Sequence, residues 1–187
     1  MAWLEFASAF LLVLVAELGD KTQLAVAVMA VRGRALQVFA GAAAAFLVLT
    51  LLAVTLGAAV ASAVPAKWTN LAAGLLFLGM GALAFLRKDD KEAEELVRGA
   101  TMGSAFLAVA LAEFGDKSQL ATSALAAQGD AFLVGLGVLL ALFVNAALAA
   151  VLGAKLLSRL PARTLKVVSC ALFLVAGAWL LAAAAAG

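Results

Sequence analysis

Two apolar segments each carry two acids and a lysine near their middle. The first reads SAFLLVLVAELGDKTQLA, and the second, SAFLAVALAEFGDKSQLA, repeats 13 of its 18 residues. The charged residues are Glu17, Asp20 and Lys21 in the first segment, and Glu113, Asp116 and Lys117 in the second. Because the acids are three residues apart and the lysine follows the glutamate by four, we predict that all three charges of each motif lie on one face of a helix. Each ionised group would cost roughly 2.5 to 3.5 kcal/mol at a bilayer centre, so these groups must be paired, protonated or facing a water-filled cavity.

The charges of the two motifs predict a bound cation. Four carboxylates and two lysines leave a formal charge of −2, which one divalent cation or two protons would neutralise. Carboxylate, amide and hydroxyl oxygens suit Mg, Ca or Mn, whereas a chain with no histidine and one isolated cysteine disfavours Zn or Cu. The supporting motif positions are Gly19, Thr22 and Gln23 in the first copy and Gly115, Ser118 and Gln119 in the second.

The two motif glycines allow two interpretations. Gly19 and Gly115 remove a side chain beside each carboxylate, which permits either close helix packing or a local break that exposes backbone carbonyls as further ligands. Other polar residues inside the apolar segments, Thr50 and Asn145 among them, have no counterpart in the other half. For each of these we expect a hydrogen bond between packed helices.

The composition is that of an all-helical integral membrane protein. Hydrophobic residues make up 67% of the 187 residues, and the mean hydropathy is +1.16. Abundant alanine and glycine fit closely packed transmembrane helices, and there is no period-two alternation of the kind that strands show. A net charge of +2 is too small to indicate nucleic acid. The predicted spans are roughly 4–30, 35–63, 68–87, 99–127, 131–157 and 164–185, each at least as long as the roughly 20 residues that a span needs.

An offset of 96 residues relates the two halves without a gap, carrying Pro65 onto Pro161. We therefore predict a first three-helix repeat over residues 1–87, a charged cytoplasmic linker over 88–98 and a second three-helix repeat over 99–187. Because three spans is an odd number, the second repeat enters the membrane from the opposite side.

This inverted layout predicts both the topology and the site. Ten lysines and arginines fall on one side and a single lysine on the other, so the positive-inside rule places the basic side in the cytoplasm and both termini outside. A pseudo-two-fold axis in the membrane plane can then bring all four carboxylates together at mid-depth. The predicted metal ligands are Glu17, Asp20, Glu113 and Asp116.

Three other interpretations use the same residues. The acids and lysines could form ion pairs between helices that merely hold the halves together, although two acids would then be left over. A negative site could instead receive the ammonium of a basic amino acid such as lysine. Asp20 and Asp116 could also form an intramembrane aspartyl protease, but this leaves both glutamates and both lysines without a task.

The hexapeptides ELGDKT and EFGDKS resemble the E-x-G-D-[KR]-[TS] signature that occurs twice in the Golgi-type divalent cation transporter family. The resemblance covers nearly the whole chain and implies a non-enzymatic exporter of Mn²⁺, and often Ca²⁺, coupled to protons, with the motif acids as ligands. It implies no cofactor beyond the transported ion. The expected partners are divalent cations, protons, the lipid bilayer and a second copy of the chain. The short chain favours a bacterial inner membrane, with transport out of the cytoplasm.

Overall fold

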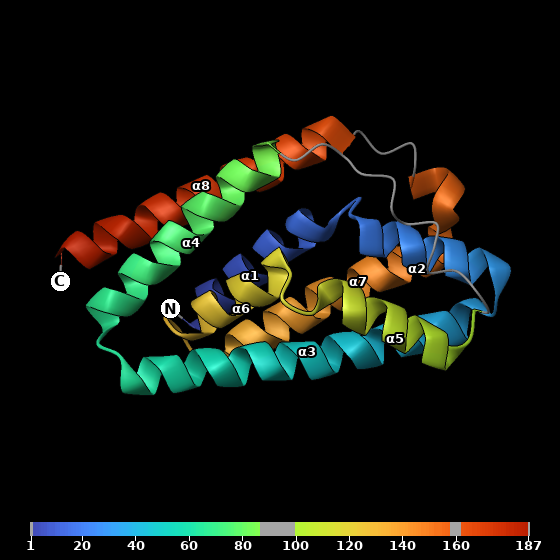
Figure 1. The fold of residues 1–187 in the computed structure, drawn as a ribbon, viewed down its shortest axis with the longest axis horizontal. Helices are drawn as coiled ribbons and strands as arrows, with labels where there is room; N and C mark the ends of the chain where they lie inside the picture. The colour runs from blue at the N-terminus through green and yellow to red at the C-terminus, as the bar shows by residue number, and fades with distance from the viewer. Residues whose placement is uncertain (1, 87–99, 158–161, 187) are drawn as a thin grey trace.

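The computed structural model describes residues 2–86, 100–157 and 162–186, in which every regular element is an α-helix (Figure 1). The helices are α1 (Ala2–Glu17), α2 (Lys21–Arg32), α3 (Ala35–Ala63), α4 (Ala66–Leu86), α5 (Met102–Glu113), α6 (Lys117–Ala126), α7 (Ala131–Leu157) and α8 (Ala162–Ala186). The predicted linker and Pro161 lie outside the described residues.

Four of the predicted spans correspond to one helix each, namely α3, α4, α7 and α8, with a kink in α7 at Gly153, where φ is 68°. The spans predicted at 4–30 and 99–127 are each two helices, because the chain breaks at the acidic motif. Gly19 has φ 77° and Gly115 has φ 75°, values that an α-helix near −63° cannot contain. The prediction that each motif's charges share one helical face is therefore wrong.

Three of the described helices are long and apolar enough to cross a membrane: α3, residues 131–153 of α7 and residues 167–185 of α8. Helix α5 is apolar but shorter. Large aliphatic and aromatic side chains such as Leu51, Val151 and Trp179 project outward from the long helices. An apolar outer surface of this extent fits a lipid environment.

Equivalent helices of the two halves pack in a reciprocal pattern. Helices α1 and α2 pack on α7, while α5 and α6 pack on α3, and α3 and α7 also contact each other. Helices α4 and α8 run side by side along one edge of the molecule (Figure 1). This exchange places both motif breaks against the central α3 and α7 helices.

Small residues allow the reciprocal contacts to be close. A Cβ atom on Gly41 of α3 would collide with the carbonyl oxygen of Met102 of α5, and one on Gly137 of α7 would collide with that of Phe6 of α1. The two glycines are 96 residues apart. The same close packing therefore occurs twice, at equivalent positions of the two halves.

We expect Gly41→Ala and Gly137→Ala each to destabilise the protein by about 1–3 kcal/mol, because backbone atoms cannot move aside for a methyl group. Gly79→Ala in α4 is the matched control, since a Cβ there has no neighbour within 4 Å. Thermal unfolding of the purified protein in detergent, followed by tryptophan fluorescence, would test this. Equal midpoints for Gly41→Ala and Gly79→Ala would contradict the packing argument.

Candidate functional site

Each acidic motif ends one helix and begins the next. Glu17 is the last residue of α1 and Asp20 is the N-cap of α2; in the second half, Glu113 ends α5 and Asp116 is the N-cap of α6. The glycine between the two acids takes the left-handed conformation that an L side chain rarely adopts. A Cβ on Gly115 would meet nothing within 4 Å, so its role is conformational and close packing does not explain it.

A glutamine side chain closes each break. The backbone N–H of Gly19 donates to Oε1 of Gln23 at 2.6 Å, and that of Gly115 donates to Oε1 of Gln119 at the same distance. An unpaired backbone N–H away from water is costly, so these bonds stabilise the interrupted helices. The side-chain amide oxygens of Gln23 and Gln119, which the sequence suggests as cation ligands, therefore already accept hydrogen bonds.

Three of the four predicted acids converge. One carboxylate oxygen each from Glu17, Asp20 and Asp116 lies within 4.8 Å of the others, and we call these residues the three-carboxylate cluster. The Glu17 residue is 3% exposed, whereas Asp20 and Asp116 are half-buried. Asp20 and Asp116, which are 96 residues apart in the sequence, thus come from the two halves to one point.

Glu113 lies beside this cluster and has its own partners. Its Oε2 accepts a hydrogen bond from the hydroxyl of Ser118 at 2.9 Å, and its carboxylate also accepts one from the hydroxyl of Thr22 in the other half. Glu113 is 3% exposed. The structure therefore places this fourth acid close to the cluster but outside the group of mutually adjacent oxygens.

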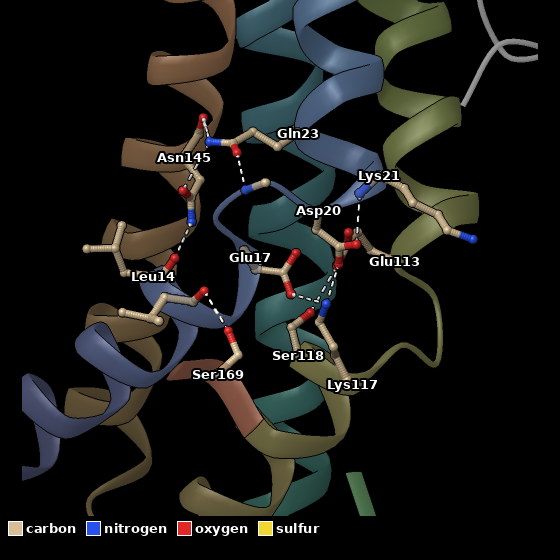
Figure 2. Close-up of polar contacts among 12 residues, drawn as sticks. Leu14, Glu17, Asp20, Lys21, Gln23, Glu113, Lys117, Ser118, Asn145 and Ser169 are labelled. Atoms are coloured by element: carbon tan, nitrogen blue, oxygen red, sulfur yellow. Dashed lines mark hydrogen bonds and ion pairs between the residues drawn. The ribbon is translucent and has the colours of Figure 1, made fainter. Parts of the chain in front are cut away.

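A lysine from the second half pairs with acids of the first half. The ammonium of Lys117 forms an ion pair with the carboxylate of Asp20 and lies 3.9 Å from Oε1 of Glu17. Figure 2 shows Lys21 extending away from Glu17, and its side chain is exposed. The contacts of Lys117 are among the interhelical ion pairs that the alternative interpretation predicted, and the Asp116 carboxylate lies in the cluster beside them.

One oxygen of the cluster is not satisfied by hydrogen bonding. Among the described residues, two buried side-chain atoms have no hydrogen-bond partner, Oε1 of Glu17 and Oγ1 of Thr50. Lys117 is too far from Oε1 of Glu17 for a hydrogen bond. A buried carboxylate oxygen in this state is a strong hydrogen-bond acceptor without a donor, and its lone pairs are available to coordinate a metal ion.

Two small cavities flank the acids, and they are copies of one another. Glu17, Thr22 and Gln23 line one, which we call the Glu17 cavity, and their equivalents Glu113, Ser118 and Gln119 line the other, the Glu113 cavity. Each has room for about one water-sized species. The remaining lining residues are Val26, Asn145 and Ala146 in the Glu17 cavity, Leu49, Thr50, Ala53 and Thr122 in the Glu113 cavity, and Phe46 and Leu142 in both.

Asn145 is a site residue that the sequence identified only as a packing residue. Its Nδ2 donates to the carbonyl of Leu14 at 3.2 Å, while Nε2 of Gln23 donates to its Oδ1 at 3.3 Å. These bonds tie α7 to both helices of the first motif, so the expected interhelical hydrogen bond is confirmed (Figure 2). The same expectation is wrong for Thr50, whose hydroxyl has no partner.

A family model and two of the related proteins that match this chain carry the same family name. The family model described as divalent cation/proton antiporter GDT1 matches residues 5–92 and 101–187, and these segments begin 96 residues apart, as the motifs do. GDT1-like protein 3 of Arabidopsis thaliana is 34% identical over 195 residues, which is 89% of this chain and 67% of that protein. GDT1-like protein 4 of the same plant is 29% identical over 213 residues, or 92% of this chain and 93% of that protein.

A further relative is longer than this chain. Protein PAM71, chloroplastic, of Arabidopsis thaliana is 36% identical over 202 residues, which is 91% of this chain and 54% of that protein. No solved structure gives a significant match.

We expect Gly115→Ala to destabilise the protein by about 1–2 kcal/mol, because alanine at this positive φ is strained even though space is free. Gly103→Ala in α5 is the matched control: it too has no neighbour within 4 Å, but it lies inside a helix, where alanine is favoured. Chemical or thermal unfolding would compare the two. If both variants were equally stable, the glycine conformation would not matter.

We also expect the ion pair between Lys117 and Asp20 to appear as non-additivity in a double-mutant cycle. With Lys117→Gln and Asp20→Asn, the coupling free energy of unfolding should be about 0.5–3 kcal/mol, since each single change leaves the other charge without its partner. A parallel cycle of Asp20→Asn with Lys67→Gln should be additive, because Lys67 lies in α4 outside the site. Additivity in both cycles would show that the ion pair contributes nothing.

Proposed function

This chain belongs to the GDT1 family of divalent cation/proton antiporters, and from that premise we propose that it exports Mn²⁺ or Ca²⁺ from the cytoplasm in exchange for protons. The observation that carries the proposal is the three-carboxylate cluster, in which the buried Oε1 of Glu17 has no hydrogen-bond donor. The cation is the cargo of this site, and Glu17, Asp20 and Asp116 are its proposed ligands, with Glu113 beside them.

The chemistry of the cluster favours a hard divalent ion. Mn²⁺ and Ca²⁺ prefer oxygen ligands such as carboxylates and hydroxyls, and the three ligand atoms that converge are all carboxylate oxygens. The ligands come from both halves of the chain. A movement of one half against the other would therefore change the coordination, which is what release of a cargo requires.

Lys117 acts in this proposal as a tethered counter-charge. Its ammonium pairs with Asp20 and lies near Glu17, so it occupies part of the space that a cation would take. An arriving divalent cation would displace it and supply two positive charges to the same carboxylates. Protons would replace the cargo on the return step, because they too can neutralise the acids.

The ends of the broken helices act differently on the two acids of each motif. Glu17 and Glu113 stand at the C-terminal ends of α1 and α5, where the helix dipole is negative. Asp20 and Asp116 stand at the N-terminal ends of α2 and α6, where a carboxylate is stabilised. Discontinuous helices with their ends directed at the cargo are a common arrangement near the midplane of secondary transporters.

We further propose that the chain spans the membrane six times as two inverted repeats. In this layout α1 with α2, and α5 with α6, each form one interrupted span. The reciprocal packing on α3 and α7 supports it, since equivalent helices exchange places. By the positive-inside rule, the distribution of lysine and arginine favours a layout with both termini outside. Export is the direction that the resemblance to the family implies. A bacterial plasma membrane remains a prediction, because the three relatives compared come from a plant.

Export of a basic amino acid is a second candidate that one observation favours. The ammonium of Lys117 pairs with Asp20, so the site accommodates the head group of such a substrate. The cavities, however, have room for about one water-sized species, which suits a small ion and not a side chain. An aspartyl protease would need Asp20 and Asp116 as a pair that shares a proton, whereas Asp20 forms an ion pair with Lys117.

Transport by proteoliposomes containing the purified protein would test the function. With an imposed pH gradient, wild type should move Mn²⁺ or Ca²⁺. Glu17→Gln and Asp116→Asn should each reduce the transport rate at least about tenfold, because the loss of a charged ligand weakens binding of the cation at the site. Glu5→Gln is the matched control: it neutralises an acid of the same helix α1, and the new amide can still accept from the backbone N–H of Asp130.

The outcomes separate the two candidates. Metal transport that depends on pH and is lost only in the cluster variants supports the antiporter. Uptake of lysine without uptake of either metal would make the site one for an organic cation. Unchanged metal transport in both cluster variants would mean that the cargo does not use these carboxylates.

A further inference from the structure

The Glu113 cavity brings together four buried oxygen-bearing side chains. Glu113 is 3% exposed, Ser118 5%, Thr50 6% and Thr122 1%, and all four line this cavity. Thr50 comes from α3 and Thr122 from α6, and neither belongs to an acidic motif. The cavity therefore adds two possible ligands, Thr50 and Thr122, to Glu113 and Ser118 of the second signature hexapeptide.

The hydroxyl of Thr50 is unusual for a helical threonine. Thr55, one and a half turns later in the same helix, donates back to the carbonyls of Leu51 and Leu52. Thr122 likewise donates to the carbonyl of Ser118 at 2.7 Å. The Oγ1 of Thr50 is buried without any such partner. A buried hydroxyl that makes no hydrogen bond to a carbonyl of its own helix is available to contact another ligand.

The other oxygens of the cavity have lone pairs to offer. Ser118 uses its hydroxyl proton on Oε2 of Glu113, and Thr122 uses its proton on the carbonyl of Ser118. Each hydroxyl oxygen can then only accept a donor or coordinate a cation. Together with the Glu113 carboxylate, these groups form a hard, oxygen-only environment.

This ligand set is present in only one of the two cavities. At the equivalent positions of the Glu17 cavity, Thr50 is replaced by Ala146 and Thr122 by Val26. Its amide residue Asn145 is already hydrogen-bonded to Gln23 and Leu14. The two copies have therefore become chemically different, and hydroxyl oxygens are concentrated around Glu113.

We propose that the Glu113 cavity is a subsite for a small, dehydrated monovalent cation such as Na⁺, coordinated by the carboxylate of Glu113 and the hydroxyl oxygens of Thr50, Ser118 and Thr122. Glu113 is the one carboxylate among the residues that line this cavity, and one carboxylate balances one positive charge. The inference deepens the proposed function, on which its role rests, by giving a monovalent ion a place beside the divalent cargo.

Binding can be measured without transport. The unfolding midpoint of the purified protein in detergent would be titrated with NaCl against choline chloride at constant ionic strength, and separately with MnCl₂. Na⁺ should raise the midpoint of wild type, and Thr50→Val should weaken the apparent Na⁺ affinity at least about tenfold because it removes a ligand from the ion. Thr50→Ser, which keeps the hydroxyl, should retain Na⁺ binding.

Thr55→Val is the matched control, since it makes the same change in the same helix outside the cavity. It should respond to Na⁺ as wild type does. The stabilisation by Mn²⁺ should persist in Thr50→Val, because the three-carboxylate cluster is intact.

Three results would overturn the proposal. Equal midpoints in NaCl and choline chloride for wild type would mean that the cavity holds a water molecule only. An unchanged Na⁺ effect in Thr50→Val would place the ion elsewhere. Loss of the Mn²⁺ effect together with the Na⁺ effect in Thr50→Val would make this cavity part of the cargo site.

The subsite and the proposed function can fail separately. Metal transport by wild type with no Na⁺ effect on the midpoint would refute the subsite alone. A Na⁺ effect that depends on Thr50 in a protein that moves neither Mn²⁺ nor Ca²⁺ would support the subsite and refute the antiporter.

Discussion

The ammonium of Lys117 beside the carboxylates of Asp20 and Glu17 is the interaction on which the rest of the site depends. Ionised groups removed from water are costly unless they are paired or hydrogen-bonded. The protein supplies a lysine from one half to the acids of the other, and hydroxyls to Glu113. Oxygen Oε1 of Glu17 is left without a hydrogen-bond donor. Asp20 and Glu113 thus have partners in the folded protein, while this oxygen is available to a cation.

The interrupted helices are what allow so many charged groups to meet at one place. A continuous helix would put both acids of a motif on one stripe, whereas the break turns one acid into a helix end and the other into a helix cap. The break itself exposes backbone N–H groups, and Gln23 and Gln119 satisfy those of the two motif glycines. Local sequence thus makes each break stable, and the position of the break determines where the carboxylates point.

Duplication explains both the symmetry and the differences within the site. The motifs, their glutamines and the close contacts at Gly41 and Gly137 recur in both halves. Thr50 and Asn145 do not recur, and each lines only one cavity. Two related halves can therefore build one site whose two sides have different chemistry, as a transporter that handles two kinds of ion would need.

The sequence by itself determined the all-helical class, the bounds of α3 and α7, the family and the acids of interest, because hydropathy and a repeated hexapeptide are properties of neighbouring residues. It left open whether Gly19 and Gly115 pack or break the helix, and it wrongly placed the motif charges on one helical face. Only the tertiary structure decided that Glu17, Asp20 and Asp116 converge while Glu113 has hydroxyl partners, and that Thr50 has none. Those facts depend on contacts between helices distant in the chain, where small shifts in packing decide which atoms meet.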